Sequence, residues 1–238
     1  MNKGFLIAVC LSIGSIIGLS CKNRSAEPHI TGNTVPGTPV ISYEDFKKAI
    51  NVKRLAYKKL SAAGFNKRVL QDSITDFWVN TIGTGLFSYW EGTGWNFNGT
   101  TQIPKQGSIA CGYLVTTLLA DMHVKLNRVK LAQYASSQMM KALTPGQPIK
   151  KYDHLSFDMF VKSVNQLKKG IYIIGLDIHT GFIIHDGTAA YFLHSYYHKN
   201  IGVIKEPVAT SNALKQSVTK WMISLTGDTI FIENWLKE

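Results

Sequence analysis

Hydrophobic positions recur at helical spacing through the first third of the chain. Over residues 42–64 apolar side chains return every four or five positions, and Ser42 precedes them as a candidate N-cap. A second apolar face follows over residues 66–82, and Gly83 and Gly85 are expected to end it. The pattern therefore predicts two N-terminal helices.

The middle of the chain predicts further helices that differ in exposure. Residues 112–125 are apolar over so wide a face that this helix is expected at the centre of the domain. Residues 129–143 predict one amphipathic helix. Another helix is expected to end at Leu167, with either Asp153 or Ser156 as its cap.

After Gly170 the period of the apolar positions changes to that of strands. The segments that predict strands are 171–176, 178–184, 190–196 and the shorter 202–204. A helix over residues 213–225 and a last strand over residues 229–232 complete the pattern. Helices followed by an antiparallel sheet predict an α+β domain, in which the sheet packs against the central apolar helix.

The dipeptide Asp186-Gly187 predicts a two-residue hairpin loop, because a type I′ turn needs positive φ at both central residues. With this loop, His179 and His194 lie directly opposite each other on one face of the strand pair, whereas a three-residue loop would separate them. Opposed imidazoles pack poorly, but one can fix the tautomer of the other in a catalytic site. Two half-buried structural histidines are the alternative. His185, nearer the turn, is expected to be exposed.

The first 42 residues have the pattern of targeting and linker sequence. Residues 1–20 combine an early lysine with a short apolar stretch of small residues, which predicts a signal peptide. The sequence Gly-Leu-Ser-Cys that ends at Cys21 resembles a bacterial lipoprotein cleavage box, which implies lipid on Cys21. An ordinary signal peptide with a chance cysteine is the alternative. Residues 21–42 predict a flexible tether, so the protein is expected to be exported and lipid-anchored to a bacterial membrane, on its periplasmic or cell-surface side.

The composition fits one domain with a full apolar core. The 238 residues are 45% hydrophobic and 17% charged, so a single domain is expected over residues 43–238, with residues 43–85 as its helical N-terminal part. The formal charge of +11 favours an anionic neighbourhood such as a membrane surface, a cell wall or nucleic acid. The basic residues are scattered and match no nucleic-acid motif, so no nucleic-acid partner is expected.

One of the three cysteines is expected to remain a thiol in the mature protein. Cys10 leaves with the signal peptide, lipid occupies Cys21, and Cys111 stays unpaired in a compartment where thiols usually pair. Cys111 opens the central apolar helix, where the helix dipole and free N–H groups favour a thiolate and a developing oxyanion. A nucleophile is the preferred interpretation, and a small buried core residue is the alternative.

The order of these residues resembles that of a known family. A cysteine that opens a long apolar helix is followed, after further helices, by His-x-Gly at His179, two apolar residues, a glycine turn and His194 on the next strand. Over residues 86–197 this pattern is similar to the papain-like cysteine peptidases, most of all to their NlpC-type cell-wall branch. The resemblance implies a papain-like fold with Cys111 as nucleophile, His179 as general base and His194 as the residue that orients the base.

Four more residues are assigned to the site through this resemblance and their setting. Tyr89 and Trp90 stand in a Ser-Tyr-Trp-Glu-Gly stretch similar to the Tyr-x-Trp-Gly-Gly of the family, whose tyrosine lies near the oxyanion. Gln106 is similar in position to the oxyanion glutamine of papain, and Gly112 is expected to let substrate approach the backbone. The aromatic, glycine-rich segment 86–101 is expected either to line the cleft or to pack as a surface loop.

These expectations describe a cysteine peptidase or amidase. A Cys-His-His set would cleave amide bonds through a thioester, with peptidoglycan stem peptides as the leading substrate. The family's Asp-Cys-Ser-Gly is here Ala-Cys-Gly-Tyr, which leaves open whether the substrate is peptidoglycan or protein. A catalytically inactive binding lipoprotein of the same fold and a thioester acyltransferase are the alternatives. No cofactor and no metal site are expected, although a Cys-His-His set has the chemistry to bind zinc, and a monomer is expected.

Overall fold

The structure is a computed structural model that describes residues 41–198 and 201–237. The signal peptide over residues 1–20, the lipidation at Cys21 and nearly all of the tether lie outside these residues and remain predictions. The described residues belong to one compact unit, Pro36–Glu238. Within them, every helix is too short or too polar to cross a membrane.

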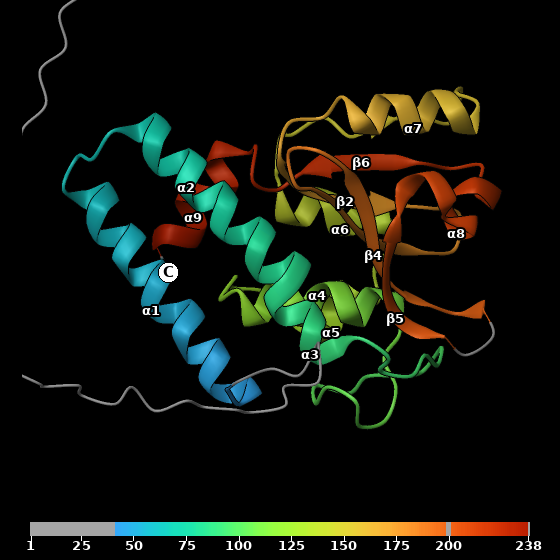
Figure 1. Cartoon of the computed structure of the whole chain (residues 1–238), viewed down its shortest axis with the longest axis horizontal. Helices are drawn as coiled ribbons and strands as arrows, with labels where there is room; N and C mark the ends of the chain where they lie inside the picture. The colour runs from blue at the N-terminus through green and yellow to red at the C-terminus, as the bar shows by residue number, and fades with distance from the viewer. Residues whose placement is uncertain (1–40, 199–200, 238) are drawn as a thin grey trace, which may run out of the picture. The chain divides into compact units, whose positions relative to one another are not determined.

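The two predicted N-terminal helices are confirmed. Helix α1 (Tyr43–Ala62) begins at Ser42, whose hydroxyl accepts the N–H of the third residue along at 3.1 Å. Helix α2 (Lys67–Asn80) begins at Asn66, whose side-chain carbonyl accepts two backbone N–H groups of the first turn. Figure 1 shows α9, from the C-terminal end of the chain, beside α1 and α2.

Gly83 and Gly85 do not end the second helix as predicted. The chain continues through a π-helical turn, η1 (Thr81–Leu86), into the short helix α3 (Phe87–Trp90). A Cβ atom on Gly83 would lie 3.2 Å from the side chain of Ile184, and one on Gly85 would lie 2.3 Å from the ring of Phe46. The glycines allow close packing here instead of breaking the helix.

The central helix is present, whereas the helix predicted over residues 129–143 is divided. Helix α4 (Cys111–Asp121) buries Leu114, Val115, Leu118 and Leu119 completely. The divided helix consists of α5 (Arg128–Ala132) and α6 (Ser136–Leu143). The break falls at Ala135, whose backbone is extended, and no glycine or proline marks it in the sequence.

Helix α7 (Phe157–Asn165) begins at Ser156, so the second of the two predicted caps is the one used. Asp153 instead accepts the indole N–H of Trp221 at 2.6 Å and the backbone N–H of Lys220 at 2.8 Å.

The described strands form one antiparallel sheet of six strands in the order β1-β6-β2-β3-β4-β5. The strands are β1 (Lys150–Lys151), β2 (Gly170–Gly175), β3 (Thr180–His185), β4 (Ala190–Tyr196), β5 (Gly202–Pro207) and β6 (Trp221–Ser224). The predicted α+β class and the antiparallel sheet are confirmed.

Of the last two predicted elements, the helix over residues 213–225 is confirmed only at its start, and the strand over residues 229–232 is wrong. Residues 213–225 form a short helix, α8 (Asn212–Gln216), after the 3-10 turn η3 (Val208–Thr210), and then strand β6. The segment predicted as a last strand is helix α9 (Thr229–Lys237). Its apolar residues Phe231, Ile232, Trp235 and Leu236 are buried along one side, which is helical spacing that the four residues 229–232 were too few to reveal.

Alternate residues of β3 and β4 face two different layers of helices. Phe182 and Leu193 pack with α4 in the larger apolar cluster. Ile183 and Phe192 pack in a second cluster, which contains Phe160 of α7 and Leu214 of α8. The sheet is therefore buried on both sides, and the parity of a residue in β3 or β4 decides which layer it meets.

The β3–β4 loop has four residues, 186–189, so the predicted two-residue loop is wrong. The Asp186 carboxylate accepts the N–H groups of Thr188 and Ala189, and Gly187 has φ +106°. The register moves by two positions, which leaves the face of every side chain unchanged. His185 is buried rather than exposed, because Nδ1 accepts the Gly187 N–H and Nε2 donates to a carbonyl of α7.

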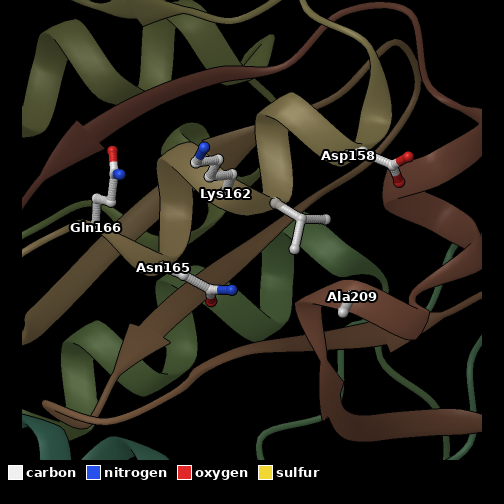
Figure 2. Close-up of a pocket in the computed structure, with 6 residues that line it drawn as sticks. Asp158, Lys162, Asn165, Gln166 and Ala209 are labelled. Carbon is white, nitrogen blue, oxygen red and sulfur yellow. The ribbon is translucent and has the colours of Figure 1, made fainter.

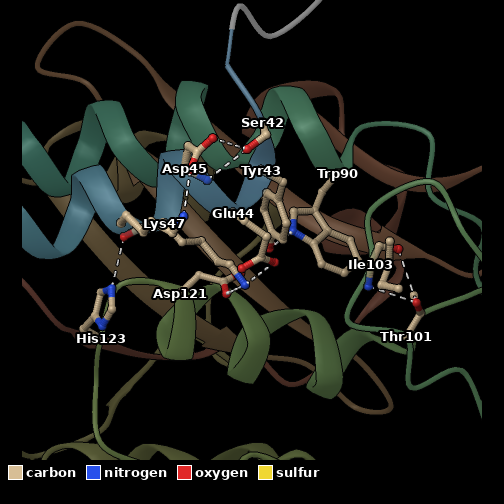
Figure 3. A network of polar contacts seen from close by, with 11 residues as sticks. Ser42, Tyr43, Glu44, Asp45, Lys47, Trp90, Thr101, Ile103, Asp121 and His123 are labelled. Carbon is tan, nitrogen blue, oxygen red and sulfur yellow. Dashed lines mark hydrogen bonds and ion pairs between the residues drawn. The ribbon is translucent and has the colours of Figure 1, made fainter.

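A polar network joins the start of α1 to the end of α4, as Figure 3 shows. The Tyr43 hydroxyl donates to the Asp121 carboxylate and accepts the indole N–H of Trp90 at 2.7 Å, while Lys47 Nζ lies 3.9 Å from Asp121. Burial raises the pKa of Asp121 to about 6, against the pull of the Tyr43 hydrogen bond and the Lys47 charge.

This raised pKa predicts how the substitution Asp121→Asn changes stability with pH. In the wild type, stability from the protonated carboxyl is fully present below pH 3.8 and is lost as the pH rises through about 6. At about 1.4 kcal/mol for each pKa unit, the loss approaches about 3 kcal/mol. The melting temperature of Asp121→Asn should therefore rise relative to wild type between pH 4 and pH 7. A difference independent of pH would contradict the buried, ionisable carboxyl.

Candidate active site

The candidate nucleophile and the candidate base line one pocket of about 320 Å³. Cys111 and Gly112 line it from the start of α4. His179 lines it from the loop before β3, and Thr180 from the first position of that strand. The segment between α5 and α6, which includes Tyr134, forms another wall. The pocket thus lies where the N terminus of the central helix meets the ends of strands.

Backbone hydrogen bonds from a distant loop hold the segment before Cys111. The Ile109 N–H donates to the Gly94 carbonyl at 2.9 Å, and the Ala110 N–H donates to the Gly99 carbonyl at 2.8 Å. A Cβ atom on Gly99 would lie 2.7 Å from the nitrogen of Ile109. Of the two expectations for the glycine-rich segment, the structure supports packing. The loop supports the segment before Cys111 and does not line the pocket.

Strand β4 holds the same segment from the other side. The hydroxyl of the fully buried Ser195 donates to the Ile109 carbonyl at 2.6 Å. Ser195 points toward the α4 side of the sheet, whereas its neighbour His194 points toward the other side. One strand therefore positions both the lead-in to the helix and a member of the histidine pair.

Gly112 serves helix packing. A Cβ atom at this position would lie 2.4 Å from the Ala132 carbonyl oxygen of α5. The expected approach of substrate to the Gly112 backbone remains compatible with its place in the pocket wall, but the close contact that requires glycine is with α5.

The thiol does not gain the thiolate character expected at a helix N terminus. Burial raises the pKa of Cys111 above its usual value, and the backbone N–H groups of Thr180, Gly112 and Cys111 itself only partly offset that effect. The expected lowering of the thiol pKa was wrong for the protein without substrate, because it considered the N–H groups that favour a thiolate and omitted the desolvation that opposes one.

The predicted contact between the two histidines is present, although the predicted pairing is not. His179 Nε2 lies 2.8 Å from His194 Nδ1, and the ring centroids are 5.0 Å apart. With the four-residue loop, His194 lies opposite Gly181, and a Cβ on that glycine would approach His194 Cβ to 2.9 Å. The rings therefore meet across a diagonal, which the preserved face of each side chain allows.

Of the histidine pair, His179 lines the pocket with Cys111, whereas His194 lies outside it, on the side of the sheet away from α4. His194 stacks on Phe192 with a centroid distance of 4.0 Å, on the face away from α4. His179 precedes β3 at the end of the sheet, next to the pocket that contains Cys111. Among residues 41–198 and 201–237, no hydrogen bond joins Cys111 Sγ to either ring.

Both rings are neutral at neutral pH. Burial and the proximity of His194 lower the pKa of His179 to about 3. Burial also lowers the pKa of His194, against the opposing effect of Glu206. Two neutral rings can share one hydrogen bond, whereas two charged rings at this distance would repel.

The sequence did not identify Glu206, whose Oε1 lies 3.2 Å from His194 Nε2. In the β4–β5 register Glu206 lies opposite Phe192, on the same face as His194. The predicted strand 202–204 stopped short of this residue. Had the predicted strand been continued to Glu206, the alternation of its side chains would have placed a carboxylate beside the histidine pair.

Tyr89, Trp90 and Gln106 do not reach the pocket. The Tyr89 hydroxyl donates to the Ile41 carbonyl at 2.7 Å, and its ring contacts aromatic residues of α1. Trp90 is fully buried in the α1–α4 network of Figure 3. Gln106 is exposed, and its backbone N–H bonds to Ile103. The geometry gives none of the three an oxyanion or substrate-lining role.

A second hollow, of about 390 Å³, contains none of the predicted site residues. Figure 2 shows Asp158, Lys162 and Asn165 of α7 along it, with Ala209 of η3 nearby. Throughout the described part of the chain, no group of three or more His, Cys, Asp or Glu side chains is arranged to hold a metal ion.

Comparisons with protein-family models, with curated proteins and with solved structures gave no match to this chain. The function must therefore be argued from the residues and geometry of the pocket.

The close contact at Gly112 predicts a stability effect. Gly112→Ala should lower the free energy of unfolding by about 1–3 kcal/mol, because α4 and α5 must separate to admit the new methyl group. Gly94→Ala is the matched control, since a Cβ there meets only a carbonyl at 3.5 Å. Chemical denaturation of the full chain measures both. Equal stability of the two variants would show that α5 is not held rigidly against α4.

The raised thiol pKa predicts slow alkylation of Cys111 at neutral pH. The rate with iodoacetamide should climb about tenfold for each pH unit through pH 8, because only the thiolate reacts. Quantifying the Cys111 peptide by mass spectrometry separates it from the other cysteines. The same residue in the denatured chain is the control, and its rate curve should lie at lower pH. A fast plateau at pH 6 would instead reveal a thiolate–imidazolium pair.

Proposed function

We propose that this protein is a cysteine peptidase or amidase of the papain-like, NlpC-type class. Cys111 is the nucleophile, His179 the general base and His194 the residue that orients the base. The observation that carries the proposal is the hydrogen bond between two buried imidazoles beside a pocket that also contains a helix-terminal free cysteine. The resemblance to the papain-like family implies roles for the same three residues.

Burial of the histidine pair favours a catalytic role over a structural one. His179 is 5% exposed and His194 is fully buried, so both imidazoles have lost most of their hydration. Apolar residues of similar volume would fill such a space at lower cost, because they have no polar atoms to satisfy. Fixed proton donors and acceptors at a pocket edge are useful when a proton must be moved.

The proposed reaction begins from the neutral thiol and the neutral imidazole. As Cys111 Sγ attacks the amide carbonyl carbon, its proton passes to His179. His179 then gives that proton to the leaving amine, and a thioester remains. Water hydrolyses the thioester, releases the acid and restores the thiol. Catalytic hydrogen bonds are often long without substrate, and the reaction requires Sγ and the ring to approach each other in the occupied pocket.

Backbone N–H groups are the proposed oxyanion donors. Those of Cys111, Gly112 and Thr180 surround the thiol closely enough to favour negative charge there. The helix N terminus adds its dipole in the same direction. Tyr89 and Gln106 are not needed for this role, and they lie elsewhere.

The proposed substrates are peptides, with peptidoglycan stem peptides first among them. The expected export and lipid anchor would put the domain near the cell wall, and the charge of +11 favours an anionic polymer as its neighbour. A non-catalytic binding protein of the same fold is the second candidate, because Cys111 Sγ has no hydrogen bond to His179 and the thiol pKa is raised.

Incubation of the full chain with purified peptidoglycan and, separately, with a protein substrate tests the proposal. Mass spectrometry should detect cleaved amide bonds with the wild type and none with Cys111→Ala. His179→Ala should lower turnover by about 10²–10⁴-fold, and His194→Ala by less. Adding an amine acceptor distinguishes hydrolysis from acyl transfer by the product.

His154→Ala is the matched control, since His154 is exposed and lies outside the pocket. It should turn over substrate like the wild type, and each variant should remain folded at the assay temperature. Turnover that persists in Cys111→Ala would reject the nucleophile. Retention of peptidoglycan fragments without any cleavage by the wild type would favour the binding protein.

A further inference from the structure

Three ionisable side chains form a continuous hydrogen-bonded line on one face of the sheet. His179 Nε2 lies 2.8 Å from His194 Nδ1, and His194 Nε2 lies 3.2 Å from Glu206 Oε1. They come from the loop before β3, from β4 and from β5. The line ends at His179 Nδ1, the one ring nitrogen of the pair without a partner within the described residues.

The carboxylate end of the line decides where the protons are. Burial alone would raise the pKa of Glu206, but hydrogen bonds from His194 and Ser211 outweigh it, and the pKa lies below the usual value. Glu206 is therefore ionised at neutral pH and can only accept a hydrogen bond. His194 must donate from Nε2, which leaves its Nδ1 bare, and His179 must then donate from Nε2.

We propose that Glu206 is a positioning residue that fixes the tautomers of both imidazoles, so that His179 presents a bare Nδ1 as its proton-accepting atom. The reverse arrangement would point a lone pair of His194 at a carboxylate. The tautomer assignment rests on the hydrogen-bonded line and on the ionised carboxylate of Glu206, and it does not depend on the proposed function. Its consequence for catalysis rests on the proposed function, in which Nδ1 takes the Cys111 proton.

Another acidic residue near the pocket cannot replace Glu206. The Asp177 carboxylate accepts the backbone N–H groups of Val218 and Thr219, each at 2.8 Å, and so fixes the loop before β6. Its oxygens are occupied, and no hydrogen bond joins it to either histidine in the described chain. Glu206 is the carboxylate that contacts the pair.

The negative charge of Glu206 also favours the step of the proposed reaction in which His179 becomes positively charged. When His179 takes a proton, positive charge develops in a buried place where it is otherwise disfavoured. Glu206 can stabilise that charge through His194 without receiving the proton itself, as the acid of a Ser-His-Asp triad does. The effect should therefore appear in kcat more than in KM.

Nuclear magnetic resonance of the full chain labelled with ¹⁵N-histidine tests the inference directly. Long-range ¹H–¹⁵N spectra distinguish protonated from bare ring nitrogens, and the variants His179→Gln and His194→Gln assign the two rings. In the wild type both rings should be protonated at Nε2 only. Glu206→Ala should produce a mixture of tautomers at both. Glu206→Gln keeps an acceptor oxygen and should retain the wild-type pattern.

A wild-type His179 that is protonated at Nδ1, or a pattern unchanged in Glu206→Ala, would overturn the inference. The wild-type spectrum decides even where Glu206→Ala fails to fold. The control Glu233→Ala removes an exposed carboxylate of α9 and should change neither ring.

Kinetics on the same variants separate this inference from the proposed function. Glu206→Ala should lower kcat by about tenfold to a hundredfold with KM little changed, less than loss of the base itself. A rise in KM alone would reject the catalytic consequence. If the wild type shows the expected tautomers but no turnover, the positioning role stands and the proposed hydrolase activity does not.

Discussion

The hydrogen bond between the buried rings of His179 and His194 is the interaction on which the candidate site depends. One imidazole must donate and the other must accept, so at least one ring must be neutral, and each neutral ring must hold one tautomer. Burial supplies the first condition, because it lowers the pKa of both rings. Glu206 supplies the second, and Phe192 keeps the ring of His194 in one plane by stacking. The conditions are linked, since two protonated rings could not share the hydrogen bond and would repel each other.

The position of Cys111 in the candidate site is set by backbone contacts. Cys111 is the first residue of α4, and its direction is set by where residues 109 and 110 are held. Those residues bond to the glycine loop at 94–99 and to Ser195 of β4, while Gly112 lets α5 approach the first turn. Segments far apart in the sequence therefore converge on one turn of helix. A cysteine placed in this way cannot move independently of the sheet, because Ser195 and His194 are neighbours in one strand.

The sequence predicted what depends on periodicity and missed what depends on tertiary contacts. Three sheet strands, the first two helices and the helix at Cys111 were correct because each has a long, regular apolar pattern. The predicted register was wrong by two residues, yet the two rings meet, because a shift of two preserves the face of each side chain. Residues 217–237 were misassigned because their apolar runs are short. Tyr89 was placed by the resemblance of a short motif and Gln106 by its distance from Cys111, and neither determines where the chain turns. Glu206 required a strand boundary, which is the least certain part of such predictions.

The same burial that keeps the histidines neutral also keeps the thiol neutral, and this shapes the proposed chemistry. Desolvation raises the pKa of Cys111 and lowers that of His179, so both effects oppose a resting thiolate–imidazolium pair. An ion pair would then form only while the thiol attacks, when the developing oxyanion and the backbone N–H groups share the negative charge. The positive charge that then develops on His179 is stabilised through His194 by the carboxylate of Glu206. Burial of this kind disfavours reaction of the thiol with oxidants in the empty site, because oxidation also proceeds through the thiolate. A neutral resting state with a remote carboxylate therefore suits the proposed reaction, which requires Cys111 to stay reduced until substrate binds.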